Sequence, residues 1–302
     1  MNSLPLVTIV TPTYNQADFL ACTVNSVLTQ TYPHIEYIVI DDGSTDNTST
    51  VMAAYNGRLR YIKQSNVGQA ATLNRGWSLA NGTLLGYLSS DDCLKPNAIS
   101  ELVRALTENS DAMVAYVDFE LIDAAEKPFR HIEAEDYDYE RLSVDLICQP
   151  GPGAIFRRQV FEKIGGWNES LSQAPDFEYW LRTSLLGRFV RVPKNLAQYR
   201  VHEESGAFRP VSPKRSNEIV DVIVKYWNKK NNSRALRSRA ISKAYLIAAK
   251  SHGQSGRISV AFIFWIKAIS LNPKSVLKLD TWRMLISGIL RRHIHKVFRG
   301  KK

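Results

Sequence analysis

The sequence predicts an α/β fold in which a mostly parallel central sheet is flanked by helices. Short β-rich runs alternate with helical patterns through the first half of the chain, as in parallel sheets that carry helices on both faces. The 302 residues are 44% hydrophobic and 23% charged, which is typical of a globular protein with an ample core. A polar stretch with two prolines, FRPVSPKR, then leads into an entirely helical pattern.

The same boundary divides the charge of the chain. Residues 1–212 contain 18 Lys+Arg and 26 Asp+Glu, for a net charge of −8, whereas residues 213–302 contain 21 and 3, for a net charge of +18. We therefore expect an acidic catalytic or binding domain over residues 1–212 and a basic helical extension over residues 213–302. No RNA- or DNA-binding motif accompanies the basic segment, so nucleic acid is not an expected partner.

Five runs in the first half are predicted strands because they are short and rich in β-branched and aromatic residues. They cover residues 6–11, 35–40, 59–63, 84–88 and 112–119. Pro96 suits the first turn of a helix, and apolar residues follow it with helical spacing from Ile99 to Leu106.

The second half continues with mixed elements before it becomes helical. Residues 153–167 read as a strand, a helix and a Gly-Gly turn, and residues 174–187 as a helix that is entered through Pro175 and Asp176. Residues 196–202 are a predicted strand, and all elements beyond residue 213 are predicted helices.

Two acidic pairs follow predicted strands. Asp41 and Asp42 come after the second strand, and Asp91 and Asp92 come after the fourth. A turn explains either pair alone. Because ligands of such sheets bind beyond the carboxyl ends of the strands, we expect both pairs to open into one ligand-binding crevice.

The cysteines and the apolar runs suggest a compartment. Cys22, Cys93 and Cys148 are few and odd in number and form no CxxC pair, which favours reduced thiols in a cytoplasmic protein over a disulfide scaffold or a zinc site. The N-terminus lacks the basic start and apolar stretch of a signal peptide. No apolar run reaches the roughly 18 residues of a membrane span.

Several stretches together resemble the family 2 inverting glycosyltransferases, which have the GT-A fold. In chain order they are VTIVTPTYNQADFL, VIDDGSTDNT, NVGQAATLNRGWSLANGTLLGYLSSDD, GAIFRRQVFEKIGGWNESL, APDFEYWLR and YRVHEES. They cover residues 4–205. Each motif is weak to moderate alone, but their order and spacing are specific.

The resemblance implies a site for a nucleotide-sugar, most simply a UDP-sugar. Its implied contacts are Pro12, Tyr14, Asp42, Gly68, Gln69, Asn74 and Asp91. The family uses the second Asp after strand two to accept a hydrogen bond from uracil, which corresponds to Asp42, while Asp41 is expected to be structural. Alternatives remain open: Tyr14 also fits a half-buried loop tyrosine, and Asn74 also fits an exposed helix face.

The resemblance also implies Mn²⁺ or Mg²⁺ bound between an acidic motif and the donor diphosphate. Asp92 is the expected ligand, with Asp91 touching ribose or metal, and His202 is the second expected ligand, although a histidine there also fits a structural role. Many relatives have Asp where this chain has Ser89. Because a hydroxyl is a poorer ligand for hard cations, this difference affects the choice of metal.

Catalysis needs a base that takes the proton from the acceptor hydroxyl. The family places this Asp at the start of the helix after the Gly-Gly-Trp loop, which corresponds to Asp176. An Asp after Pro is also a common N-cap, and the two roles are compatible. Glu178 is the alternative base. Trp167 is either an apolar wall for the sugar or a packed loop aromatic.

The C-terminal third has its own signals. Residues 245–273 carry small and aromatic residues at the spacing of one tetratricopeptide unit, and a solenoid needs about three. Residues 275–302 combine apolar residues with a dense basic set. They fit either a helix on an anionic membrane surface or a core helix with a solvated basic tail.

The resemblance thus implies a metal-dependent inverting glycosyltransferase. It would transfer a sugar to a saccharide or lipid-linked saccharide in bacterial surface polysaccharide or glycan synthesis. The setting would be the cytoplasm, at the cytoplasmic face of the membrane. A sugar-phosphate nucleotidyltransferase is the alternative enzyme, although the loop after the first strand has no glycine. A non-catalytic sugar-binding or scaffold protein on the same fold is the alternative of another class.

Overall fold

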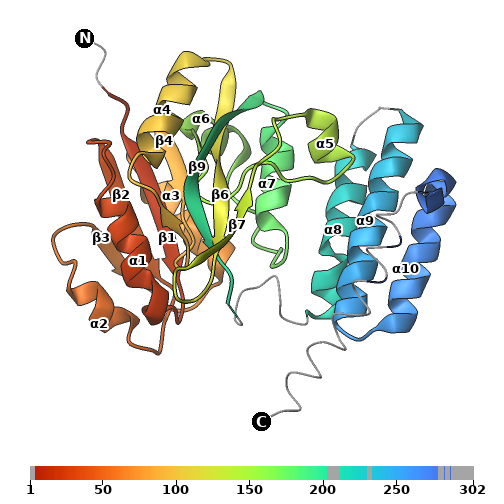
Figure 1. Cartoon of the computed structure of the whole chain (residues 1–302), viewed down its shortest axis with the longest axis horizontal. Coiled ribbons are helices and arrows are strands. Elements are labelled where there is room, and N and C mark those ends of the chain that lie inside the picture. The colour runs from red at the N-terminus through yellow and green to blue at the C-terminus, as the bar shows by residue number, and fades with distance from the viewer. Residues whose placement is uncertain (1–3, 203–210, 230–232, 278–281, 283–285, 287–302) are drawn as a thin grey trace. The chain divides into compact units, whose positions relative to one another are not determined.

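The computed structural model describes residues 4–202, 211–229, 233–277, 282 and 286 (Figure 1). The chain divides into two compact units. The sheet unit comprises Met1–Tyr137, Cys148–Ser170 and Pro175–His202, and the helical unit comprises Asp138–Ile147, Leu171–Ala174 and Glu203–Lys302.

The sheet unit is built on a nine-stranded mixed sheet. Its strands are β1 (Val7–Thr13), β2 (Ile35–Asp41), β3 (Arg60–Lys63), β4 (Leu84–Tyr87), β5 (Cys93–Leu94), β6 (Ala112–Ile122), β7 (Pro128–Ile132), β8 (Ile155–Arg157) and β9 (Arg188–Arg200). The strand order is β3-β2-β1-β4-β8-β6-β9-β5, and β7 pairs with β6 (Figure 1).

The first half of the sheet agrees with the prediction. β3, β2, β1 and β4 are all parallel neighbours, and each begins within one residue of its predicted start. In β1, Val7, Ile9 and Val10 are completely buried, as a strand covered on both faces requires. The predicted α/β class is therefore confirmed.

The second half makes the sheet mixed. β8 runs antiparallel to β4 and β6, and β5 runs antiparallel to β9. β5 and β7 were not predicted. β5 has only two residues, and β7 is mostly exposed and shows no alternation of burial that a sequence pattern could reveal.

Helices pack against this sheet through apolar stripes. The helices of the sheet unit are α1 (Ala17–Leu28), α2 (Thr48–Ala53), α3 (Gln69–Leu79), α4 (Ala98–Glu108), α6 (Arg158–Ile164) and α7 (Pro175–Thr183). In α1 the buried residues Leu20, Val24 and Val27 have the spacing of one helix face. α4 begins at Ala98 after Asn97, so Pro96 precedes the helix and does not lie in its first turn.

The cysteines differ from the prediction. Cys22 of α1 and Cys93 of β5 form a disulfide across 71 residues of sequence, whereas Cys148 is free. The expectation of reduced thiols is therefore wrong for this pair, because spacing alone could not show that α1 packs beside β5. The disulfide fixes α1 to the residue that directly follows Asp92.

The helical unit contains α5 (Tyr139–Ser143), α8 (Pro213–Asn228), α9 (Arg234–Gln254), α10 (Ile258–Leu271) and a 3-10 turn over Pro273–Leu277. Trp227 is buried, and its Nε1 donates to the Ser143 carbonyl oxygen at 3.0 Å. α9 packs against both α8 and α10 (Figure 1). Gly256 has a φ of 83° in the turn between α9 and α10, which a residue without Cβ adopts readily.

The helical unit also holds the loop that precedes α7. The buried Glu218 carboxylate of α8 accepts hydrogen bonds from the backbone N–H of Ser172, at 2.9 Å, and of Gln173, at 2.6 Å. Among the helices of the described residues, none has the length and apolar character needed to cross a membrane. The predicted membrane-binding tail falls mostly on residues 278–281, 283–285 and 287–302, outside the described residues.

Candidate functional site

The two acidic pairs lie at one edge of the sheet, as predicted from the strand order. β1 is the parallel neighbour of both β2 and β4. Asp41 ends β2, and Asp42 donates its N–H to the Thr13 carbonyl oxygen of β1 at 2.8 Å. Asp91 and Asp92 follow β4 through a turn in which the Asp92 N–H donates to the Ser89 carbonyl oxygen at 3.1 Å. Both pairs therefore lie at the carboxyl ends of the two strands that flank β1.

Asp42 is a buried carboxylate that organises the loop before α3. Its Oδ1 accepts from the Val67 N–H at 2.9 Å and from Gln64 Nε2 at 2.8 Å, and its Oδ2 accepts from the Gly68 N–H at 2.8 Å. Burial raises the pKa of Asp42, but these hydrogen bonds outweigh it and hold the pKa below its usual value. Gly68 has a φ of 94°, which favours glycine at this position. The structure thus brings Asp42 and Gly68 together.

Asp41 has the structural role that was expected. It is completely buried, its Oδ1 accepts from the Ser44 N–H at 2.7 Å, and its Oδ2 accepts from the Tyr61 hydroxyl at 2.8 Å. These bonds fix the turn after β2. The carboxylate therefore lies inside the fold.

The segment after β1 carries Tyr14, whose side chain is 48% exposed. Its neighbour Asn15 fixes the segment, because Asn15 Oδ1 accepts from the Thr45 N–H at 2.8 Å. Tyr14 is therefore an exposed ring on a braced loop, beside the residues that follow Asp42. Pro12, by contrast, is buried within β1, so its side chain is not at the surface where a nucleotide would bind.

Asn74, a predicted nucleotide contact, is bonded to the Gly-Gly-Trp loop. Its Nδ2 donates to the Trp167 carbonyl oxygen at 2.9 Å and to Glu169 Oε1 at 3.0 Å, and its Oδ1 accepts from the Trp167 N–H at 2.7 Å. A Cβ at Gly166 would lie 2.0 Å from Asn74 Oδ1, which explains the glycine there. Asn74 therefore clamps the Gly-Gly-Trp loop, while Gln69 is exposed at the start of α3.

Trp167 is packed by this clamp. It is buried, and its ring meets the Tyr87 ring edge-on with the centroids 5.0 Å apart. Of its two predicted roles, the structure favours the packed loop aromatic. The ring therefore supports Tyr87, the last residue of β4.

The two aspartates after β4 have different partners. His202 Nε2 lies 3.1 Å from Asp91 Oδ2, so the histidine pairs with Asp91 and not with Asp92. Asp92 is buried, and its Oδ1 accepts from the Arg200 N–H at 2.9 Å. Burial, and after it the charge of Asp91, raises the pKa of Asp92 well above its usual value. The geometry therefore favours Asp91 and His202 as the pair that faces a ligand. Asp92 instead stabilises the end of β9.

Arg200 is a residue of this site that sequence reasoning missed. Its side chain is 1% exposed, and its Nε donates to the Asp91 carbonyl oxygen at 2.8 Å. The guanidinium lies over the Phe19 ring at 5.0 Å, and the Phe19 and His202 ring centroids are 4.7 Å apart. Arg200 thus positions the backbone of Asp91 beside His202. No sequence signal could have identified it, because its partners come from distant segments.

Asp176 is the second residue of α7, since the helix begins at Pro175. It lies in the first helical turn and is not the N-cap that the sequence suggested. Burial raises the pKa of its carboxyl group, although backbone N–H groups of the first turn oppose the shift. The alternative base, Glu178, is paired with Arg182 at 2.8 Å. Arg182 also donates to the carbonyl oxygens of Ile164 and Gly166 at 2.6 and 2.7 Å, so Glu178 helps to hold the Gly-Gly-Trp loop.

Two tyrosines connect Asp176 with the acidic pair. Burial raises the pKa of Tyr87, and the charges of Asp176 and Asp92 raise it further. Burial raises the pKa of Tyr199 to about 12, with added contributions from Asp92, Asp91 and Asp176. Tyr87 ends β4 and Tyr199 lies in β9 directly before Arg200, so both phenols lie on the strands that lead to the acidic pair and to His202.

The donor set fits a divalent cation that is shared with a ligand. Among the described residues, no group of three or more His, Cys, Asp and Glu side chains is placed to hold a metal alone. Asp91 and His202 supply one oxygen and one nitrogen donor side by side. Mg²⁺ and ions like it are commonly held by one or two carboxylates together with substrate phosphates. The pair therefore fits a metal site that a diphosphate completes.

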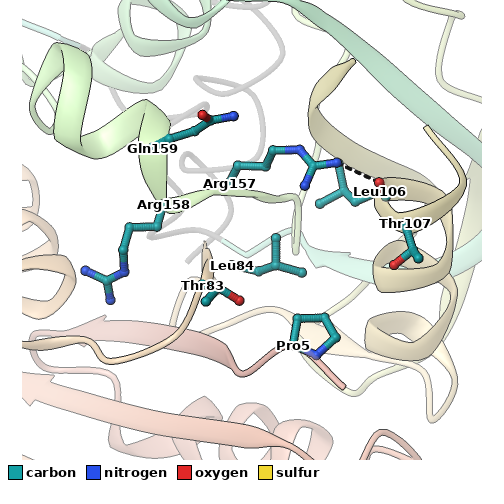
Figure 2. Close-up of a pocket in the computed structure, with 8 residues that line it drawn as sticks. All are labelled: Pro5, Thr83, Leu84, Leu106, Thr107, Arg157, Arg158 and Gln159. Atoms are coloured by element: carbon teal, nitrogen blue, oxygen red, sulfur yellow. Dashed lines mark hydrogen bonds between the residues drawn. The ribbon is translucent and has the colours of Figure 1, made fainter. Parts of the chain in front are cut away.

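A pocket of about 350 Å³ lies at the other edge of the sheet (Figure 2). It is lined by Leu84, which begins β4, by Arg157, which ends β8, and by Arg158, which begins α6. Arg157 donates to the Leu106 carbonyl oxygen at 2.7 Å (dashed in Figure 2), and Arg158 donates to the Gly82 carbonyl oxygen at 2.6 Å. These guanidinium groups cross-link backbone segments, so we assign the pocket a structural role.

Comparisons with known proteins identify the family of the chain. Residues 8–165, about half of the chain, match the family model described as Glycosyl transferase family 2. An uncharacterized glycosyltransferase of Rickettsia typhi is 31% identical over 207 residues, which are 66% of this chain and 65% of the relative. The chain thus spans slightly less than two thirds of that relative's length. The family match does not reach the helical extension, so its tetratricopeptide character stays a prediction.

Solved structures are similar at the level of the fold. Residues 1–349 of S. aureus TarS in complex with UDP superpose with a TM-score of 0.63 at 16% identity, covering 98% of this chain and 92% of that one. The mannosyltransferase PcManGT from Pyrobaculum calidifontis, in complex with GDP-Man and Mn²⁺, gives 0.61 at 17% identity, covering 100% and 89%. With the sheet described above and the match over residues 8–165, these findings show that the chain belongs to glycosyltransferase family 2 and has the GT-A fold.

Proposed function

We propose that the protein transfers a sugar from a UDP-sugar to a hydroxyl group of a saccharide or lipid-linked saccharide, with inversion at the anomeric carbon. The observation that carries the proposal is the Asp91–His202 pair, with 3.1 Å between Oδ2 and Nε2, beyond the carboxyl end of β4. In the same sheet unit, α7 carries Asp176, whose pKa burial raises. This combination suits group transfer from a diphosphate.

The nucleotide would bind between the loop after β1 and the loop before α3. Tyr14 offers an exposed ring for a nucleobase. A carboxylate has about four lone-pair sites, so Asp42 can accept a base N–H in addition to its bonds with the 64–68 loop. Gly68 and the exposed Gln69 border the same region. That TarS is solved with UDP supports this choice of nucleotide.

Asp91 and His202 would hold Mn²⁺ or Mg²⁺, with Arg200 and Asp92 fixing the segments on which they lie. A cation bound there would neutralise charge on the departing diphosphate. PcManGT is solved with Mn²⁺, which supports a divalent ion. Ser89, in place of a family Asp, adds no charge to this site.

Asp176 would act as general base. Its raised pKa brings the carboxylate closer to the working pH, where a base accepts a proton most effectively. A base on one side of the sugar and the diphosphate on the other favour a single displacement, which inverts the anomeric carbon. Trp167 packs behind Tyr87, so the Gly-Gly-Trp loop would shape the sugar pocket indirectly.

A panel of UDP-sugars with Mn²⁺ and saccharide acceptors tests the proposal by measuring product and released UDP. The Asp176→Asn variant should keep UDP affinity and lose roughly 10²- to 10⁴-fold in transfer rate. Transfer by Asp176→Asn at the wild-type rate would overturn the assignment of the base. UDP binding by the wild type without transfer to any acceptor would favour a sugar-binding protein, and pyrophosphate release from UTP and a sugar phosphate would favour a nucleotidyltransferase.

A further inference from the structure

We propose that α10 attaches the protein to an anionic membrane surface through an exposed apolar face. This α10 face consists of Ile258, Phe262, Ile263 and Ile266. The side chains of Phe262, Ile263 and Ile266 are 51%, 50% and 49% exposed. The inference goes beyond sugar transfer and does not depend on it.

The α10 face is unusual because it exposes large apolar side chains, whereas the fully buried residues of α10 are small. Ala261 and Ala268 are completely buried, and the Ser242 hydroxyl of α9 donates to the Ala268 carbonyl oxygen at 2.8 Å. An ordinary amphipathic helix buries its large apolar residues against the protein. α10 contacts α9 through these alanines and through Phe264, whose ring meets those of Tyr245 and His252 edge-on. Phe262, Ile263 and Ile266 stay about half exposed, which marks an interaction surface.

The face has the shape that an interfacial helix needs. Ile258, Phe262 and Ile266 are four residues apart, so they form one row along the helix. Trp282 and Ile286 add exposed apolar surface beyond α10, and the Trp265 and Trp282 ring centroids lie 5.0 Å apart. Tryptophan is enriched where protein meets the membrane–water interface.

Charge identifies the partner as anionic. The sequence has no acidic residue between Asp221 and Asp280, and residues 213–302 carry a net charge of +18. Lys267 lies on α10 itself, with its Nζ over the rings of Tyr245 and Phe264 at 5.7 and 5.4 Å. Lys267 is itself exposed, so its ammonium group is also accessible to lipid headgroups. Anionic lipid headgroups attract such a segment.

The same charge argues against a second copy of the chain on this face. Two copies meeting through α10 would bring two strongly basic segments together, and like charges oppose association. A bilayer that contains anionic lipid accepts the apolar residues and neutralises the basic ones. We therefore infer that the α10 face binds an anionic bilayer.

The test is sedimentation of the full chain with vesicles of phosphatidylglycerol and phosphatidylcholine. The wild type should bind these vesicles, bind pure phosphatidylcholine weakly, and dissociate as salt is raised. The double variant Phe262→Ser with Ile266→Ser should bind at least about tenfold more weakly, because it removes two inserted apolar side chains. The matched control is Phe129→Ser with Leu185→Ser, since these sheet-unit side chains are 57% and 55% exposed. The control should bind as the wild type does.

Each outcome decides the proposal. Equal sedimentation of the Phe262→Ser, Ile266→Ser variant and the wild type would overturn it. Absence of wild-type binding, with self-association in ultracentrifugation that the same variant abolishes, would assign the face to a second copy. Because both substituted side chains are half exposed, circular dichroism should show unchanged helix content, so lost binding cannot be attributed to unfolding.

Discussion

Replacing Asn74 separates two roles for this residue, a nucleotide contact and a clamp on the Gly-Gly-Trp loop. The structure gives its side-chain amide three hydrogen bonds, at 2.7, 2.9 and 3.0 Å, two of them to the backbone of Trp167. Asn74→Ala removes all three. At about 0.5–1.5 kcal/mol net for each bond, with the exposed bond to Glu169 at the low end, the free energy of unfolding should fall by about 2–3 kcal/mol.

Asn74→Ala should lower the stability of the protein without lowering its affinity for UDP. For a unit of this size a loss of 1 kcal/mol lowers Tm by about 2–4 °C, so Asn74→Ala should melt roughly 4–12 °C below the wild type. Affinity for UDP, measured by calorimetry at a temperature where both proteins are folded, should stay unchanged. Asn74→Asp is the matched variant: it keeps an acceptor for the Trp167 N–H but brings a negative charge toward Glu169, so it should also be destabilised.

The opposite pattern would refute this reasoning. If Asn74→Ala melts with the wild type and binds UDP at least about tenfold more weakly, then Asn74 contacts the nucleotide and the bonds to Trp167 contribute little. Gln69→Ala is the internal control. Gln69 is exposed at the start of α3, so its loss should leave Tm unchanged and weaken UDP binding if this edge of the sheet holds the nucleotide.

Three further predictions test the metal pair, the disulfide and the base. Asp91→Asn should weaken Mn²⁺-dependent UDP binding in calorimetry by about tenfold or more. Asp92→Asn keeps an acceptor for the Arg200 N–H and should weaken this binding less. If Asp92→Asn weakens the binding more than Asp91→Asn does, then Asp92 is the main metal ligand. A thiol reductant, or Cys22→Ser, should lower the free energy of unfolding, measured in urea, by about 2–4 kcal/mol. If a reductant leaves the urea unfolding transition of the wild type unchanged, the disulfide between Cys22 and Cys93 is contradicted. The transfer rate should rise with pH through the raised pKa of Asp176. Because that raised pKa favours the protonated folded form, stability is lost as pH rises from the unfolded to the folded pKa. Asp176→Asn should therefore raise Tm more at pH 7 than at pH 4, and equal Tm changes would contradict the raised pKa.

The sequence predicted those parts of the fold whose signals are local. β1 to β4 were found because runs such as residues 6–11 are buried strands with strong β propensity. The edge that carries Asp42 and Asp91 followed from the strand order, since parallel neighbours end together. β5 was not found, because two residues carry no period, and its pairing with β9 depends on tertiary contacts.

The parts of the site that the sequence missed depend on contacts between distant segments. His202 and Asp91 are 111 residues apart, and only the register of β9 decides which of two adjacent aspartates meets the imidazole. The roles of Asn74 and Arg200 depend likewise on loops that no periodicity describes. The residue types were enough to suggest a metal site and a general base. Which side chain each of these residues contacts could be learned only from the structure.

The hydrogen bonds from the loop before α7 to Glu218 limit where the chain can be divided into separate fragments. The charge boundary near residue 212 invites a truncated catalytic fragment, yet such a fragment would lose the acceptor for the Ser172 and Gln173 N–H groups. These residues precede the proposed base, Asp176, by four and three positions. Exchanging the helical extension between relatives would therefore alter the anchoring of the helix that bears this carboxylate. In recombination or design, α8 belongs with the catalytic sequence it follows.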